Sequence, residues 1–241
     1  RVLKLLADAY VNIRDLKNAF VTLEKAFKLA PDELSIIIKI AEVCKSLGNF
    51  KLAINFLENS IKANPDEAPL YIALSGIYRE IEEFSLYIET SKKAFKLDPN
   101  SEVTINNYGV ALTEIGEYSK AISHYKKAAK SDPNSYEILT NLGITYALTG
   151  KYSRAIPIIE KAIKINKNYS KAHYGLAKAY SEIDCYDQSI ESFQTAYKLD
   201  PLNIDAAKWM AYPFMYSYKF EDAWQQYEYR WVEVDRGGRL K

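Results

Sequence analysis

Residues 136–169 read YEILTNLGITYALTGKYSRAIPIIEKAIKINKNY, and a related pattern recurs along the whole chain at a fixed interval. Prolines mark this interval most simply. Five of them lie at multiples of 34 residues from one another: Pro31, Pro65, Pro99, Pro133 and Pro201. The one position of this lattice without a proline is Lys167. Self-similarity at a fixed period of about 34 residues is the sequence signature of a repeat architecture. The chain is therefore predicted to repeat one structural unit seven times.

Three columns, each a set of positions one period apart, hold small side chains almost throughout. The first column is Ala7, Ala41, Ser75, Gly109, Gly143, Ala177 and Ala211. The second is Ala19, Ala53, Tyr87, Ala121, Ala155, Ser189 and Ala223. The third is Ala26, Ser60, Ala94, Ala128, Ala162, Ala196 and Arg230. Helices can approach to about 8 to 10 Å only where a small side chain faces the partner, so these columns predict close helix crossings.

Two further columns hold large apolar side chains, which we expect to fill the space between those crossings. One is Leu6, Ile40, Leu74, Tyr108, Leu142, Leu176 and Met210, and the other is Leu16, Phe50, Phe84, Tyr118, Tyr152, Tyr186 and Phe220. Within a unit the apolar positions follow the i, i+3, i+4, i+7 spacing of a helix. Gly48, Gly116 and Gly150 stand where a first helix should end in a left-handed residue. Each unit is therefore predicted to be two antiparallel helices joined by a short turn.

The predicted fold is all-α: a solenoid of seven helix-turn-helix repeats, each of about 34 residues, forming a right-handed superhelix without a globular core. We expect one array over residues 1–237, followed by a tail, 238–241. The expected repeats are 1–33, 34–67, 68–101, 102–135, 136–169, 170–203 and 204–237.

The pattern closely resembles the tetratricopeptide repeat (TPR) family, on the strength of Asn141-Leu142-Gly143, Tyr146, Gly150, Tyr152, Ala155, Ala162 and the boundary Asp132-Pro133-Asn134. The resemblance covers the chain from Arg1 to about Asp235. It implies the solenoid fold and a scaffold that holds peptides or partner domains on its concave face, while function itself must be argued from the site.

The face of the first helices that is turned away from packing is the expected ligand-binding surface. Counting around each helix places these residues there: Lys39, Glu42, Arg79, Asn106, Asn107, Thr140, Asn141, Tyr174, Lys178, Lys208 and Tyr212. Asn107 and Asn141 share a column in adjacent units, and a side-chain amide can both donate to and accept from a peptide backbone. That pair resembles the asparagine ladder of O-linked N-acetylglucosamine transferase arrays, although it has two rungs only, and asparagines satisfied locally or by water are the alternative.

The last unit has two special features. The segment 220–231, FEDAWQQYEYRW, resembles the closing part of bacterial TPR arrays that precede a glycosyltransferase-like domain. Arg230 and Glu233 are charged where earlier units are small or apolar, so an eighth unit could not dock there. Its many aromatic residues form either a capping core, which we favour, or a surface for another domain, and Pro213 should kink the first helix or shift its start.

Composition and motifs argue against other functions. The net charge of +1 gives no general attraction to nucleic acid, and no apolar run is long enough to insert into a membrane. Two cysteines and two histidines fit neither a metal site nor a catalytic constellation, and no phosphate-binding loop is present. We therefore expect no enzymatic activity, no cofactor and no metal. The cytoplasm is the expected compartment, although the chain does not begin with Met, which leaves room for native residues before Arg1.

Three hypotheses remain open at this stage. The first is a protein-interaction scaffold that binds a peptide or a partner helix in the concave groove. The second is a substrate-recruiting TPR arm of a larger glycosyltransferase-like enzyme. The third is a TPR array that associates with copies of itself.

Overall fold

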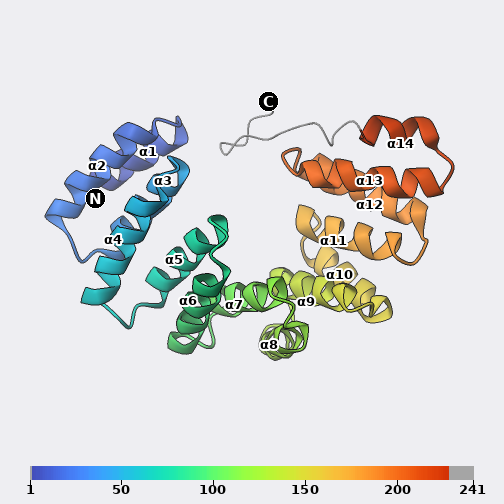
Figure 1. Cartoon of the computed structure of the whole chain (residues 1–241), viewed down its shortest axis with the longest axis horizontal. Helices are drawn as coiled ribbons and strands as arrows, with labels where there is room; N and C mark the ends of the chain where they lie inside the picture. The colour runs from blue at the N-terminus through green and yellow to red at the C-terminus, as the bar shows by residue number, and fades with distance from the viewer. Residues whose placement is uncertain (1, 228–241) are drawn as a thin grey trace. The chain divides into compact units, whose positions relative to one another are not determined.

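The computed structural model describes residues 2–227, and their side chains as far as residue 225. This part of the chain is all-helical and contains fourteen helices (Figure 1). The first helices of the repeats are α1 (Val2–Asn12), α3 (Leu34–Ser46), α5 (Ala68–Glu80), α7 (Glu102–Glu114), α9 (Tyr136–Leu148), α11 (Ser170–Ser181) and α13 (Ile204–Tyr216). The second helices are α2 (Leu16–Leu29), α4 (Phe50–Ala63), α6 (Phe84–Leu97), α8 (Tyr118–Ser131), α10 (Tyr152–Ile165), α12 (Tyr186–Leu199) and α14 (Phe220–Tyr227).

The helix boundaries follow the period. Every second helix begins on one column, from Leu16 to Phe220, in steps of one period. Four helices start after an Asp, Asn or Ser whose side-chain oxygen accepts a hydrogen bond from a backbone N–H three residues on: Asp15, Asn49, Ser135 and Asn203. Such N-caps satisfy one of the donors that a helix start leaves unpaired, which fixes where the helix begins. The prediction of helix-turn-helix repeats in an all-α solenoid is confirmed.

A left-handed residue ends the turn between the two helices of every repeat. The three glycines predicted for this position, Gly48, Gly116 and Gly150, have φ angles of 74°, 80° and 72°. The other four repeats place a non-glycine residue there with φ near 60°: Arg14, Glu82, Asp184 and Tyr218. These four positions are equivalent to the turn glycines in the repeat. Because they do not hold glycine, the sequence does not indicate a left-handed conformation there. Each of them is strained, because a Cβ disfavours this conformation.

The small columns lie in the interior, as predicted. All seven members of the first column are buried, as are all seven of the second and the first six of the third, while Arg230 lies outside the described residues. Gly143 shows why size matters. A Cβ built there would lie 2.3 Å from Cγ1 of Ile159 and 3.2 Å from the carbonyl oxygen of Ala155 on α10. The helix pair α9–α10 therefore tolerates no side chain at this crossing.

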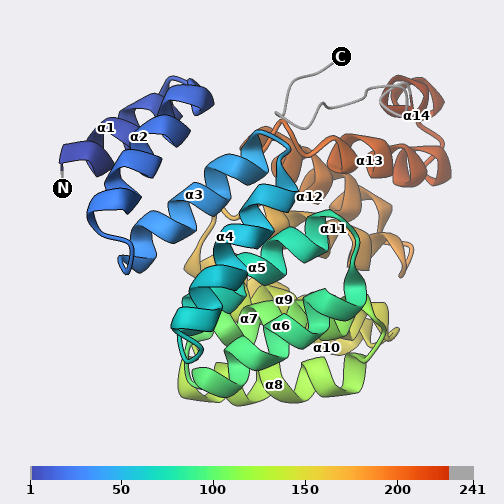
Figure 2. The ribbon, with the colours of Figure 1, turned by 60° about the vertical axis from the view of Figure 1, so that its left-hand side comes forward.

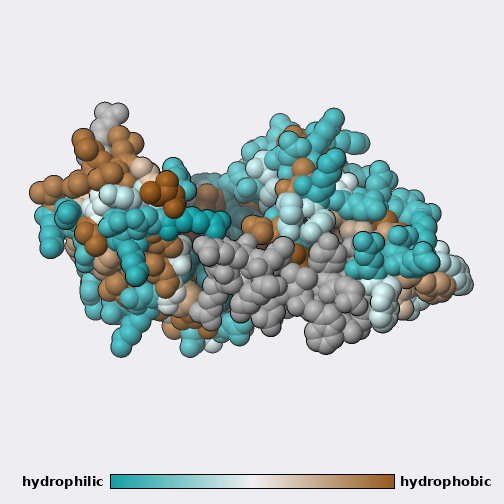
Figure 3. Space-filling view, turned by 90° about the horizontal axis from the view of Figure 1, so that it is seen from above, coloured by the Kyte–Doolittle hydropathy of each residue, from teal (hydrophilic) through white to brown (hydrophobic). Residues whose placement is uncertain are grey.

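The large columns are less uniform than predicted. In the first, Ile40 is fully buried but Leu6 is 43% exposed, because in this structure α1 has no preceding helix pair to pack against. Figure 3 shows hydrophobic side chains gathered over the α1–α2 end, and Val2, Leu5 and Ile13 are among the exposed ones. The second column is half-buried at best, and Phe84 and Phe220 are exposed. Leu16 and Phe50 pack against the core of unit 1, but the column lies less deep than predicted, since these residues are the first of their helices and lie at the rim of the turn.

One tyrosine–glutamate hydrogen bond recurs at the same lattice points in two places. The Tyr78 hydroxyl donates to Oε1 of Glu58 at 3.1 Å, and the Tyr180 hydroxyl donates to Oε1 of Glu160 at 2.9 Å. Burial, assisted by the adjacent carboxylate, raises the pKa of both tyrosines to about 12. Both hydroxyls are therefore protonated donors at neutral pH, and each fastens a first helix to the second helix of the preceding repeat.

The chain divides into two compact units, unit 1 (Arg1–Ala111) and unit 2 (Leu112–Lys241), and each is described by itself. In unit 1 the helix pairs stack in chain order, so that α3 contacts both α2 and α5 (Figure 2). One apolar core runs through this unit, from Ala7 and Leu23 to Tyr87. In unit 2, α11 packs likewise against α10, α12 and α9. The single array over 1–237 with a tail at 238–241 stays a prediction.

Pro213 lies inside α13 and is buried. The helix nevertheless begins at Ile204, on the lattice, so the expectation of a shifted start is wrong. The proline stands near the C-terminal end of the helix, where it removes one backbone hydrogen bond without displacing the first turns.

We predict opposite effects on stability for two substitutions at the turn. Gly150→Ala should lower the free energy of unfolding by about 1 kcal/mol, because alanine is strained at this positive φ. Glu82→Gly should raise it by up to roughly 1 kcal/mol by relieving the same strain. Thermal unfolding followed by circular dichroism measures both, with Glu82→Ala as the control, and equal unfolding temperatures for all variants would contradict the assignment of strain.

A second pair of substitutions tests the helix crossing. Gly143→Ala should destabilise the protein by about 1 to 3 kcal/mol, because its methyl group would overlap Ile159. Gly76→Ala should stabilise it by about 0.5 to 1 kcal/mol, because Gly76 lies within α5 and a Cβ there has no atom within 4 Å. Chemical denaturation of both variants provides the measurement, and a stabilising Gly143→Ala would refute close packing at this column.

Candidate functional site

The residues predicted to bind a ligand differ in how accessible they are. Glu42, Arg79 and Tyr212 are exposed. Half-buried side chains make up the largest group: Lys39, Asn106, Asn107, Tyr174, Lys178 and Lys208. Thr140 and Asn141, in contrast, are only 0% and 5% exposed. The expectation that these two lie on an open inner face is wrong, because α9 is enclosed by α8, α10 and α11.

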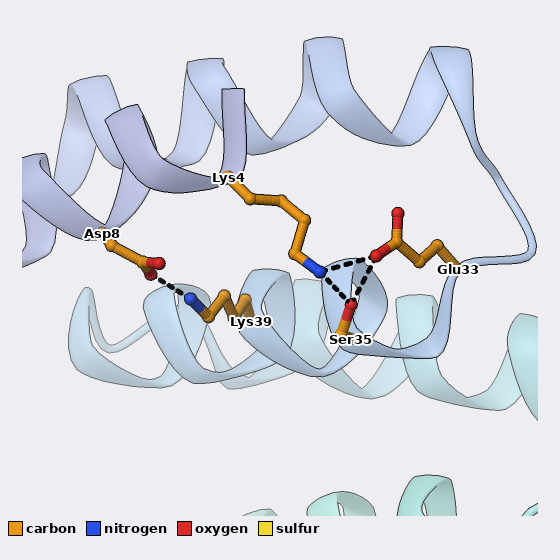
Figure 4. A network of polar contacts seen from close by, with 5 residues as sticks. All are labelled: Lys4, Asp8, Glu33, Ser35 and Lys39. Atoms are coloured by element: carbon orange, nitrogen blue, oxygen red, sulfur yellow. Dashed lines mark hydrogen bonds and ion pairs between the residues drawn. The ribbon is translucent and has the colours of Figure 1, made fainter. Parts of the chain in front are cut away.

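Lys39 is occupied by a contact within the protein. Its ammonium group is paired with the Asp8 carboxylate, which joins α3 to α1 (Figure 4). Next to this pair, Nζ of Lys4 donates to Oε1 of Glu33 and to Oγ of Ser35, each at 2.6 Å. The hydrogen bond from Lys4 lowers the pKa of the Glu33 carboxyl group. Exposed pairs of this kind contribute little to stability, but they hold Lys39 away from a ligand.

Unit 1 contains an open groove on its first helices, which we call the unit 1 groove. Its volume is about 550 Å³. It is lined by Ile38, Ala41, Glu42, Lys45, Ala68, Pro69, Ile72, Ala73, Gly76, Ile77, Asp98, Ser101, Val103, Thr104 and Asn107. The apolar majority with a few polar groups, and the volume, are typical of binding sites. Two residues predicted for ligand binding, Glu42 and Asn107, are thus brought together in one groove.

The polar groups of the unit 1 groove are not all available. Lys45 is paired with Glu80 at 3.4 Å. Asp98 follows the end of α6 and is engaged in the turn before α7, since its Oδ1 accepts from the N–H of Ser101 at 3.2 Å and its carbonyl oxygen accepts from the Thr104 hydroxyl. Within the described part of the chain, the Glu42 carboxylate and the Asn107 amide have no hydrogen-bond or ion-pair partner. These two groups are therefore free to meet a ligand.

Unit 2 has a smaller groove of about 310 Å³, the unit 2 groove. It is lined by Ile144, Ala147, Leu148, Tyr152, Tyr174, Gly175, Lys178, Ala179 and Glu182. Its floor is closely packed, because a Cβ on Gly175 would lie 2.7 Å from Cγ1 of Ile144. At its rim the Tyr152 hydroxyl donates to Oε2 of Glu182 at 3.4 Å.

Lys178 is held on aromatic rings at the edge of the unit 2 groove. Its Nζ lies 4.7 Å from the ring centroid of Trp209 and 5.8 Å from that of Tyr174. A ring face attracts a cation without consuming its hydrogen-bond donors. Burial, with the nearby charge of Asp205, raises the pKa of Tyr174 to about 12, so this hydroxyl stays protonated at neutral pH. Trp209 stands in the same column as Asn107 and Asn141, but the sequence does not indicate its contact with Lys178.

The aromatic residues of the last unit are mostly exposed. Phe214 is buried, whereas Trp209, Tyr212, Tyr216, Tyr218 and Trp224 are between 44% and 82% exposed. The favoured capping core is therefore wrong for these five rings, which lie on the open face of α13 and beyond its end. The side chains of Tyr227, Tyr229 and Trp231, together with Arg230 and Glu233, lie outside the described residues.

Residues with catalytic potential are scattered. Cys44 is buried, and burial raises the pKa of its thiol to about 11. His124 is half-buried, and burial together with Lys127 lowers its pKa. His173 lies with Nε2 2.9 Å from the carbonyl oxygen of Lys167. Among residues 2–227 no group of His, Cys, Asp and Glu could hold a metal ion, and no helix there is long and apolar enough to cross a bilayer.

Comparison with solved structures finds the same fold in several proteins, two of which are described as TPR proteins. A TPR protein from Parabacteroides merdae is 13% identical, with a TM-score of 0.76 over 94% of this chain and 90% of that chain. A thermophilic TPR protein from Thermus thermophilus is 18% identical, with a TM-score of 0.63 over 74% of this chain and 97% of that chain. PilF of Pseudomonas aeruginosa is 21% identical, with a TM-score of 0.64 over 81% and 87%. At these identities the likeness shows the fold alone.

No curated protein matches the chain. Two family models do match it. The model described as "Tetratricopeptide repeat" covers residues 1–33, 34–67, 136–169 and 170–201, and the model described as "TPR repeat" covers residues 109–150. Nothing in these comparisons bears on the resemblance of residues 220–231 to arrays that precede a glycosyltransferase-like domain. Since the family models match more than half of the residues and the helices follow the same period, the chain belongs to the tetratricopeptide repeat family, whose members are typically non-catalytic scaffolds that bind proteins or peptides.

Proposed function

We propose that this protein is an interaction scaffold that binds segments of partner proteins on the open face of its first helices. The observation that supports this most directly is that both units have a groove on that face: α3 and α5 line one, and α9 and α11 line the other. The grooves are apolar over most of their area and bring in charged groups at the edge. A linear peptide could bury its apolar side chains in such a groove, while the edge sets its register.

The chemistry of the two grooves differs although both lie at equivalent positions of the repeats. One column illustrates this: Asp8, Glu42, Gly76, Val110, Ile144, Lys178 and Tyr212. This column contributes Glu42 and the open space at Gly76 to the unit 1 groove. It contributes Ile144 and Lys178, which is held on aromatic rings, to the unit 2 groove. Each groove would therefore select a different segment, and one partner with two motifs, or two partners, could be bound by the same chain.

The lysines of unit 2 provide the first test. The double variant Lys178→Glu and Lys208→Glu should lose partners that are captured by the unaltered protein, because it reverses charge on the open face of α11 and α13. The matched control is Lys161→Glu and Lys198→Glu, which makes the same change in net charge on the second helices α10 and α12, where both side chains are exposed. Quantitative mass spectrometry of pull-downs compares the three proteins, and equal losses in both double variants would contradict binding on the first helices.

The asparagine pair should split into two roles. Asn107→Ala should weaken peptide binding several-fold without lowering the unfolding temperature, because Asn107 is half-buried and unpaired in the unit 1 groove. Asn141→Ala should instead lower stability by about 1 to 2 kcal/mol, because this amide is buried and its loss leaves polar groups inside unit 2 unsatisfied. Peptide titration and thermal unfolding of both variants measure this. Equal losses of affinity with no change in stability would restore the ladder hypothesis for both positions.

A further inference from the structure

Gly76 differs from Gly143 and Gly175, two other glycines in the interior of first helices. At Gly143 and Gly175 a Cβ would collide with isoleucine side chains of neighbouring helices. At Gly76 the same atom would have no neighbour within 4 Å, and the residue is exposed in the middle of α5. Glycine is one of the least favourable residues in the interior of a helix. Packing within the protein therefore does not explain why position 76 holds a glycine, and the empty space above it is the place to seek the reason.

That space belongs to the unit 1 groove. Ile38 and Ala41 of α3 lie on one side of it, and Val103 of α7 lines it as well. Ile72, Ala73 and Ile77 of α5 flank Gly76 itself. A large apolar side chain entering the groove could therefore contact these aliphatic groups and rest on the backbone of α5, where any other residue would place a side chain. The groove has the form of an anchor pocket for one bulky apolar residue.

The charge of the groove indicates what accompanies that residue. Of the charged side chains lining it, Lys45 is neutralised by Glu80, which leaves the carboxylates of Glu42 and Asp98 in excess. Glu42 is exposed and without a partner in the described part of the chain. An unpaired carboxylate at the edge of an apolar site favours a basic group and disfavours an acidic one. The Asn107 amide on the other side can bond to the backbone of an extended segment.

We propose that the unit 1 groove binds a linear segment of a partner protein in which a large apolar side chain is accompanied, within one or two residues, by a lysine or arginine. The apolar side chain lies over Gly76, the basic group pairs with Glu42, and Asn107 holds the main chain between them. This inference rests on the proposed function and adds the chemistry of one partner segment to it.

The test is selection of peptides from a random 12-residue library displayed on phage, using the full chain as bait. The selected peptides are then synthesised with a fluorescent label, and their dissociation constants are measured by anisotropy. The expected peptides pair an aromatic residue or leucine with a nearby lysine or arginine. Gly76→Phe, which fills the groove, should weaken their binding tenfold or more. Glu42→Gln should weaken it about three- to tenfold, and less so at high salt.

The controls separate this inference from the broader proposal. Gly76→Ala adds one methyl group and should change affinity much less than Gly76→Phe, while Glu191→Gln removes an equally exposed carboxylate from α12 and should change nothing. Circular dichroism verifies that each variant keeps its helices. Peptides that lack a basic residue, or that bind Gly76→Phe as tightly as the unaltered protein, would overturn the inference. If those peptides were nevertheless lost on Lys178→Glu with Lys208→Glu, the proposed function would stand, whereas failure to select any peptide would count against both.

Discussion

The fold depends on the short distance between neighbouring helices, and small side chains at the crossings allow that distance. Where α9 crosses α10, Gly143 faces Ile159 and the backbone of Ala155 so closely that one added methyl group would overlap. The same column is buried in every repeat, whether it holds alanine, serine or glycine. Because the contact recurs in each repeat, each helix pair has a surface that only the next pair can cover. Stability is therefore local and depends on contacts between neighbouring helix pairs, while the exposed part of the first-helix face contributes little to it.

Much of the fold could be predicted because these contacts are periodic. The turn glycines, the starts of the second helices and the buried alanines all follow from a lattice that the sequence displays directly. The four strained turn residues, such as Glu82 and Tyr218, lie on the same lattice but give no compositional signal. The exposed rim position of Phe84 was missed for a different reason: periodicity tells which residues are equivalent, but not how deeply a shared position lies.

The candidate site was harder to predict, since exposure and pairing depend on three-dimensional neighbours. Thr140 and Asn141 occupy columns whose other members, apart from the buried Gly175, are half-buried or exposed, yet the helices around α9 bury them. Lys39 is on the expected face, but its ammonium group forms an ion pair with Asp8 of the preceding repeat. Gly76 stands one position after the crossing column that contains Gly143, but only the structure shows that the space around it is empty. In unit 2, Trp209 contacts Lys178 of the preceding repeat. A pattern within one repeat cannot predict a contact between two repeats.

The column that runs from Asp8 to Tyr212 has a consequence for how such a protein can change over time. Its residues include an acid, a glycine, aliphatic side chains, a base and an aromatic ring, and the helices around them keep one geometry. Substitutions in that column can therefore alter what the surface recognises at little cost to folding, while the alanine and glycine contacts beneath it admit almost none. Proteins built in this way can diverge far in sequence and acquire new partners through single substitutions, while the backbone structure stays the same.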